Sequence, residues 1–402
     1  MGRGMTDLTG TAPRWMGVGH SVHADAASAG TEAVTRALGG RVAGLLIVYS
    51  SYGYDLERLL DGVRGHADAG TVIVGCTTLG EVSPFLPDPP VEGVVVLALG
   101  GTGLEVRAAV GRDVSTQRRE AGMAAVAGVA ELTREHRVGL LLCDGLVGEQ
   151  HDVVRGAYSV VGAIVPLVGG CAGDDLSYSR THQFFGDRDG VEVLTDAVVG
   201  VGLGSDGPLG IGIAHGWHKR GEPMIVTRSS GGRLFELDGA AALDVYLARV
   251  GLDRDLLGDI KSFRTAVFAS PLGLSRRTGE DIRVVHDGDL DDGSLLCLAD
   301  VPQGALAWVM GTDDESMISA GAESCAQAIG NLNGADPVGV MVFDCGARKV
   351  MLGPQGVTRE ITAMTEMTAG APMGGFYTYG EFARTRGARG MHHLTVVTLA
   401  LA

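Results

Sequence analysis

Short apolar runs recur along the chain, and most of them end in glycine-rich polar turns. The clearest run, Val94–Leu99, is nearly repeated by Val396–Leu401. Runs of this length predict buried strands, and their high β-branched content supports that interpretation. Longer segments with apolar residues at helical spacing, such as 26–38 and 116–135, alternate with these runs. The alternation of the two patterns predicts an α/β protein.

One order of elements appears three times: helix, strand, helix, strand, glycine-rich turn, strand. The first strands of these units begin near residues 45, 140 and 339. Because the second interval is about twice the first, residues 205–311 are expected to hold a fourth, degenerate unit. The helical crossovers require parallel strands, whereas the short turn-to-strand steps allow antiparallel pairing. We therefore predict repeated units that form mixed sheets covered by helices, in two docked domains.

The glycine-rich turns are themselves related in sequence. Gly75–Glu81 (GCTTLGE) returns as Gly375–Glu381 (GFYTYGE), with Gly, Thr, Gly and Glu at identical spacing. A shorter relative is Gly169–Asp175 (GGCAGDD). In α/β sheets ligands bind beyond the carboxyl ends of strands, where loops expose backbone amides. We therefore expect the function to lie at these three turns.

Charge and cysteine content exclude several classes of function. The net charge is −16, and the only lysines are Lys219, Lys261 and Lys349, so no basic cluster indicates nucleic-acid binding. No apolar run reaches the roughly 18 residues of a membrane span, and Met1–Arg14 lacks the apolar core of a signal peptide. The six cysteines show no C-x-x-C spacing, which favours free thiols in a reducing cytoplasm.

The turns offer backbone amides, hydroxyls and carboxylates, and these groups suit an amino acid or a similar metabolite. The alternative is that the glycines only permit positive φ angles and that Glu81 and Glu381 cap or pair locally. Arg348, which follows another apolar run, is an anion-binding candidate unless it forms a surface ion pair. The candidate ligand-binding residues are Gly75, Cys76, Thr77, Thr78, Glu81, Cys171, Asp174, Arg348, Tyr377, Thr378 and Glu381.

Other chemistries have weaker support in the sequence. Cys76 and Cys171 occupy similar places in two units, but no spacing of three or four ligands indicates zinc, and buried thiols explain them as well. Asp174 has the alternative of a turn residue. Cys345, helped by Arg348, is a candidate nucleophile for a hydrolase or transferase. We predict no metal and no cofactor.

In its motifs the chain resembles the FIST proteins (F-box and intracellular signal transduction). The resemblance implies a disordered tail at 1–14, a FIST N-like domain at 15–235 and a FIST C-like domain at 236–402. One departure is His393, where the family usually has Asn. The motifs that carry it are Val74–Thr78 with Gly80 and Glu81, Val168–Asp174, His215–Trp217, Val226–Thr227, Glu236–Gly239, Ala242–Tyr246, Phe343–Cys345 with Arg348, Pro372–Glu381, and His393 with Thr395.

The resemblance implies a sensory domain proposed to bind small ligands, amino acids among them, with no established catalytic residues. Many relatives are fused to signalling output domains, for which 402 residues leave no room. The leading hypothesis is therefore a cytoplasmic sensor that binds a small polar ligand and acts through a signalling protein partner. The alternatives are an enzyme that uses Cys345 and Arg348, and a ligand-free interaction scaffold with one large exposed apolar patch.

Overall fold

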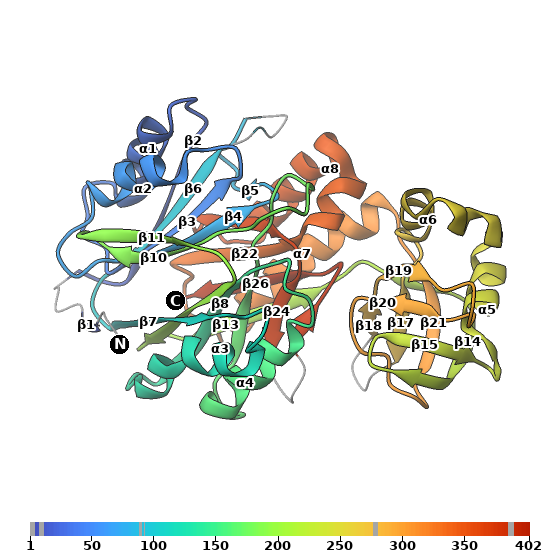
Figure 1. Cartoon of the computed structure of the whole chain (residues 1–402). Helices are drawn as coiled ribbons and strands as arrows, with labels where there is room; N and C mark the ends of the chain where they lie inside the picture. The colour runs from blue at the N-terminus through green and yellow to red at the C-terminus, as the bar shows by residue number, and fades with distance from the viewer. Residues whose placement is uncertain (1–4, 8–11, 88–90, 92, 276–279, 385–389) are drawn as a thin grey trace. The chain divides into compact units, whose positions relative to one another are not determined.

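The computed structural model describes residues 5–7, 12–87, 91, 93–275, 280–384 and 390–402 (Figure 1). It is built of several sheets and covering helices, so the predicted mixed α/β fold is confirmed. The chain forms two compact units that interleave along the sequence. The main unit comprises the chain up to His215, Ile318–Met391 and Thr395–Ala402; the inserted unit comprises Gly216–Met317 and His392–Leu394.

Three sheets of the main unit share one four-strand arrangement. In each, two parallel strands are adjacent, a third strand pairs antiparallel with the first of them, and a fourth pairs antiparallel with the third. Unit starts predicted near 45, 140 and 339 coincide with β3, β8 and β22. In spatial order the strands are β2 (Trp15–Ser21), β6 (Val94–Gly100), β3 (Leu45–Ser51) and β4 (Val72–Thr78); β7 (Leu104–Arg112), β12 (Ala197–Ser205), β8 (His136–Cys143) and β9 (Leu167–Cys171); and β13 (Leu209–Ala214), β26 (Val396–Leu401), β22 (Gly339–Cys345) and β23 (Met373–Thr378).

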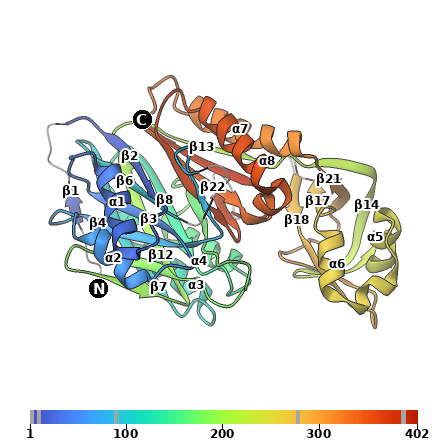
Figure 2. The same cartoon turned by 90° about the horizontal axis from the view of Figure 1, so that it is seen from above.

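A pair of helices accompanies each of these sheets (Figures 1 and 2). The first helix shows how the sequence sets its limits. Asp25 accepts a hydrogen bond from the Ser28 amide at the N-terminus, and Gly39 ends the helix with a φ of 53°. Ala29, Ala33 and Ala37 are buried on one helix face. The helices are α1 (Ala26–Leu38) and α2 (Leu56–Arg64), α3 (Arg118–Ala125) and α4 (His151–Val161), and α7 (Asp314–Gly330) and α8 (Gly346–Glu366).

Three glycines fix the equivalence of the units. Gly75, Gly169 and Gly375 lie at matching register positions, opposite Val48, Leu141 and Val342 of the parallel partner strands. A Cβ atom at these glycines would lie 2.0, 2.0 and 1.8 Å from the carbonyl oxygen of that partner residue. Only glycine therefore allows the two strands of each parallel pair to approach this closely.

Each parallel pair also exchanges a strand with another sheet. After β4, the short strand β5 (Glu81–Val82) pairs with β23 of the third sheet. After β23, β24 (Glu381–Arg384) pairs with β9 of the second sheet, and after β9, β10 (Gln183–Asp187) pairs with β4 of the first. The three exchanges close a ring. One core, which includes Leu97, Val201 and Phe343, is shared by all three sheets.

The remaining strands of the main unit lie at sheet edges. β11 (Gly190–Leu194) pairs with β10, and β25 (Met391–His392) follows β24. Within the tail expected to be disordered, residues 1–4 and 8–11 lie outside the described residues, whereas β1 (Met5–Asp7) pairs with β7. The prediction that 104–110 pairs beside the preceding strand is wrong, because β7 joins the second sheet.

The inserted unit has a different topology, so the predicted fourth copy is wrong. All of its strand pairings are antiparallel among the described residues. The boundary expected after residue 235 falls within its strand β15. Its elements are β14 (His218–Ser230), β15 (Arg233–Leu237), β16 (Ala240–Ala241), α5 (Ala242–Val250), α6 (Ile260–Val267), β17 (Leu272–Ser275), β18 (Glu280–Arg283), β19 (Val285–Gly288), β20 (Leu295–Cys297) and β21 (Leu306–Gly311), with 3₁₀ turns at Arg254–Gly258 and, in the main unit, Ala127–Glu131.

Helix α8 begins thirteen residues before the helix predicted at 359–369. It is interrupted at Gly353, whose φ of 63° is not helical, and Pro354 follows directly. Proline has no amide hydrogen to donate, so a second helical segment starts there. In the parts of the chain that the structure describes, no helix is long and apolar enough to cross a membrane.

Candidate functional site

The three glycine-rich turns meet one another through backbone hydrogen bonds. We call Gly75–Glu81, Gly169–Asp175 and Gly375–Glu381 the first, second and third turns. Each turn bonds to the other two, so the ring of strand exchanges is also a ring of loops. The bonds are Leu79 N to Tyr377 O (3.1 Å), Tyr377 N to Gly80 O (2.8 Å), Tyr379 N to Cys171 O (3.1 Å), Cys171 N to Gly380 O (2.8 Å) and Gly173 N to Thr77 O (3.0 Å).

A cavity of about 260 Å³ lies beside this ring. Its walls come from the first turn, from the loop after the second turn, and from both segments of α8. Lys349 is the only charged side chain among the described residues that line it. The Lys349 ammonium donates a hydrogen bond to Leu79 O and lies 5.5 Å from the centre of the Tyr377 ring. The lining residues are Leu79, Leu176, Lys349, Val350, Gly353, Pro354 and Val357.

The loop that supplies Leu176 is held by one carboxylate. Asp174 accepts hydrogen bonds from the Ser177 hydroxyl, from the Tyr178 and Ser179 amides, and from the Tyr379 hydroxyl of the third turn. Burial opposes ionisation of Asp174, but these hydrogen bonds outweigh it and lower its pKa. The sequence alternative of a turn residue therefore describes what Asp174 does within the structure.

The same loop carries backbone strain and exposed apolar side chains. Leu176 and Tyr178 have φ angles of 69° and 51°, in the left-handed region that non-glycine residues rarely adopt. Their exposed fractions are 43% and 65%, and that of nearby Val350 on the cavity wall is 52%. Such strain persists only where the surroundings enforce it, and it gathers at functional sites.

Glu81 and Glu381 occupy equivalent buried positions behind the turns. Glu81 accepts hydrogen bonds from the Thr78 hydroxyl at 2.7 Å and from the Ser51 hydroxyl at 3.0 Å. Glu381 accepts from the Thr378 hydroxyl at 2.6 Å and from the Thr395 hydroxyl at 2.7 Å. Burial raises the pKa of Glu81 to about 7 and that of Glu381 to about 8, although the hydroxyls oppose the shift.

The other predicted residues of the turns are also buried. The Thr77 hydroxyl accepts a hydrogen bond from the His182 amide at 3.0 Å. The strand register places Cys171 opposite Cys143 and makes it equivalent to Thr77 and Tyr377, one position away from Cys76. Burial raises the pKa of both Cys76 and Cys171. The structure thus brings the predicted turn residues together, but behind the cavity wall.

Arg348 lies in a buried charge cluster. It forms ion pairs with Asp344 at 2.8 Å and with Glu360, and it donates to His215 O at 3.1 Å. Burial and then the Asp344 charge raise the pKa of Glu360, which keeps its proton and hydrogen-bonds to Asp344. The Tyr377 side chain is buried nearby, and burial raises its pKa as well. Arg348 therefore has an internal ion pair, and neither residue lines the cavity.

The remaining sequence candidates lie away from the cavity. All six cysteines are free and buried, Cys345 among them. No group of three or more potential metal ligands occurs in the described part of the chain. His393 is buried in the inserted unit, where burial and the charge of Arg283 lower its pKa to about 3. Sequence reasoning missed Lys349, although its status as one of three lysines was a usable signal.

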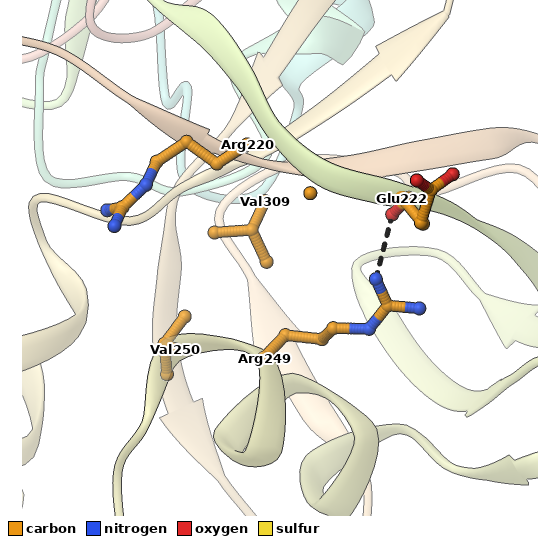
Figure 3. Close-up of a pocket in the computed structure, with 6 residues that line it drawn as sticks. Arg220, Glu222, Arg249, Val250 and Val309 are labelled. Atoms are coloured by element: carbon orange, nitrogen blue, oxygen red, sulfur yellow. Dashed lines mark hydrogen bonds between the residues drawn. The ribbon is translucent and has the colours of Figure 1, made fainter.

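A second, smaller hollow of about 170 Å³ lies in the inserted unit (Figure 3). It flanks an irregularity of β14, where the pairing with β21 shifts between Arg220 and Met224. Arg249 donates a hydrogen bond to Glu222 O at 3.1 Å, and the Arg220 guanidinium points away from that of Arg249 (Figure 3). The lining residues are Arg220, Gly221, Glu222, Arg249, Val250 and Val309.

Fold and site together define a mixed α/β protein with a ligand-sized cavity at its strand ends. Family models identify it further: the FIST N domain matches residues 44–240 and the FIST C domain matches 242–384. The chain belongs to the FIST family, and the resemblance seen in its motifs is confirmed. FIST domains are associated with signal transduction and small-ligand sensing.

Two individual proteins are similar to this chain. An uncharacterized protein of Methanocaldococcus jannaschii is 24% identical over 298 residues, which cover 69% of this chain and 56% of that protein. The chain thus spans about half the length of this relative. The crystal structure of a cyanuric acid hydrolase from A. caulinodans matches with 10% identity and a TM-score of 0.26, over 47% of this chain and 71% of that one. A likeness this low carries no argument about fold or function.

Proposed function

We propose that this protein is a sensor of a small ligand, which binds in the cavity formed by Leu79, Leu176, Lys349 and α8. The observation that carries the proposal is the convergence of the three turns in one hydrogen-bonded ring beside that cavity. Segments about 100 and 200 residues apart in sequence meet there. A ligand in the cavity contacts the first turn, the loop after the second turn and α8 at once.

The predicted site residues divide into two groups under this proposal. Lys349, Leu79 and Leu176 contact the ligand. Asp174 positions the loop that carries Leu176, because four hydrogen-bond donors of that region converge on its carboxylate. The buried side chains support the turns from behind: Cys76, Thr77, Thr78, Glu81, Cys171, Arg348, Tyr377, Thr378 and Glu381.

The response to the ligand is expected in the loop after Asp174. Its left-handed residues Leu176 and Tyr178 are exposed, so a change of the loop alters the surface offered to a signalling partner. Six unpaired cysteines support action in the reducing cytoplasm. Burial of both Cys345 and Arg348 gives the enzyme alternative no accessible reacting group at those positions.

Calorimetry and thermal unfolding with a panel of amino acids, carboxylic acids and amines test the proposal. We expect at least one compound to bind and to raise the unfolding temperature, since a ligand of the folded state stabilises it. Lys349→Met should weaken that binding, whereas Lys261→Met, which removes an exposed charge, should not. A folded protein that binds no member of the panel, or equal binding by both variants, would contradict a sensor site here.

A further inference from the structure

We infer that the cavity beside Lys349 selects a small monocarboxylate with an apolar body, and that an ammonium group on the ligand opposes binding. This inference rests on the proposed function and narrows the ligand class of the same site. It departs from the amino acids that the family resemblance implies.

The charge of the cavity wall favours an anion. Lys349 supplies the only full charge among the described lining residues, and its hydrogen bond to Leu79 O leaves that charge unneutralised. The charge of Lys349 acts on the Glu81 carboxyl, but the oxygens of Glu81 are bound by Ser51 and Thr78 behind the turn. A carboxylate in the cavity would form a charge-assisted hydrogen bond with Lys349, stronger than the bond to a neutral carbonyl.

The interruption of α8 adds to the same preference. Gly353 and Pro354 line the cavity, and the second segment of the helix begins there. The first amide groups of a helical segment have no acceptor within the helix, and this end carries partial positive charge. The dipole therefore acts in the same direction as Lys349, which remains the principal anion-binding group.

An ammonium group finds no counterpart in this cavity. None of the described lining residues is acidic, and the other side chains of the wall are apolar. The ammonium of an amino acid would lie close to Lys349 and to the positive helix end, and like charges at short range repel. The volume of about 260 Å³ lies below the range typical of drug-sized ligands, so the apolar body must be short.

Two matched sets of compounds test this inference by calorimetry at neutral pH. The first set is pentanoate, norvaline and butylamine; the second is 4-methylpentanoate, leucine and 3-methylbutylamine. Within each set the apolar body is similar and the charged groups differ. We expect a carboxylate to bind at least about tenfold more tightly than the matching amino acid, and the amine not to bind. Tighter binding of leucine or an amine, or no binding of either carboxylate, overturns the inference.

Variants test whether the cavity carries this selectivity. Lys349→Met should abolish the preference for the carboxylate, and Lys261→Met should leave it unchanged. Leu176→Asp places a negative charge at the cavity wall and should weaken carboxylate binding at least about tenfold, whereas Ile164→Asp changes a residue that is 84% exposed and should have no effect. Carboxylate binding that Leu176→Asp leaves unchanged contradicts the proposed location.

The failure of this inference can be told from the failure of the proposed function. If an amine or an amino acid binds and Lys349→Met or Leu176→Asp alters its affinity, the sensor site stands and only its ligand class is wrong. If no compound of the full panel binds the folded protein, the sensor function itself fails.

Discussion

The hydroxyl of Tyr379 donates a hydrogen bond to the carboxylate of Asp174, 205 residues earlier in the chain. The third turn thereby holds the strained loop that follows the second. Tyr379→Phe should destabilise the main unit by about 1.5–3 kcal/mol, the usual cost of losing a hydrogen bond to a charged group. Hydrogen exchange should accelerate at residues 175–180, where the local structure depends on Asp174.

The matched control for this change is Tyr52→Phe, because Tyr52 contacts His182 through ring stacking. Urea unfolding and peptide-resolved hydrogen exchange should show no comparable effect in the control. Unchanged exchange at residues 175–180 in Tyr379→Phe would mean that Asp174 holds the loop without help from the third turn.

Close approach of the parallel strands gives a second prediction. Gly75→Ala and Gly375→Ala should each destabilise the protein by about 1–3 kcal/mol or more, because the added Cβ would meet the Val48 or Val342 carbonyl oxygen. Gly330→Ala is the control, since a Cβ there meets no atom within 4 Å. Chemical unfolding of the three variants decides the matter, and equal stabilities would refute the proposed role of these glycines.

The buried carboxyls give the protein a pH dependence. Their pKa values, about 7 for Glu81 and about 8 for Glu381, exceed the value of 4.5 expected when unfolded. Between these values the folded state binds more protons than the unfolded state, so stability falls as pH rises. Each carboxyl contributes a slope of up to about 1.4 kcal/mol per pH unit, beginning near pH 5 and ending near pH 7 for Glu81 and pH 8 for Glu381.

Unfolding free energies measured from pH 5 to pH 9 test this dependence. Glu81→Gln and Glu381→Gln should each flatten the curve, because glutamine keeps the shape of the side chain without ionising. Glu366→Gln, which changes an exposed glutamate, should leave the slope as it is. Parallel curves for all four proteins would show that the two buried carboxyls do not ionise in this range.

The Arg348 cluster predicts a strong coupling between two substitutions. Arg348→Met should cost about 3–5 kcal/mol, because it leaves the Asp344 charge buried without its cation. Adding Asp344→Asn should recover part of that loss. Arg112→Met, which breaks an exposed ion pair with Glu192, should cost no more than about 1 kcal/mol. Additive losses in a double-mutant cycle of unfolding energies would contradict the coupling.

Local signals in the sequence predicted much of the main unit. Residues 26–38 form α1 as predicted, because Asp25 and Gly39 cap the two ends of an amphipathic segment. The strands were found for the same kind of reason, since each is a continuous apolar run buried on both faces. Such features depend on neighbours in the chain, which sequence patterns record directly.

Features that depend on distant partners were not predicted. Residues 266–269 carry an apolar run read as a strand, but α6 extends to Val267, and short apolar runs do not distinguish the two states. The early start of α8 was hidden because Gly353 and Pro354 suggest a boundary, although the helix only kinks there. The cavity was missed with it, because its walls come from α8 and from two separate turns.

The ring of exchanged strands has a consequence for synthesis of the protein on the ribosome. The first sheet has all its strands once residue 194 has been made, but the second still awaits β24 and the third awaits β26. Until then, the edge of β9 that β24 will cover has no partner from its own sheet, and unpaired strand edges invite aggregation. We therefore expect a nascent chain that stops before residue 381 to depend on chaperones, whereas the last 20 or so residues complete the main unit in a single cooperative step.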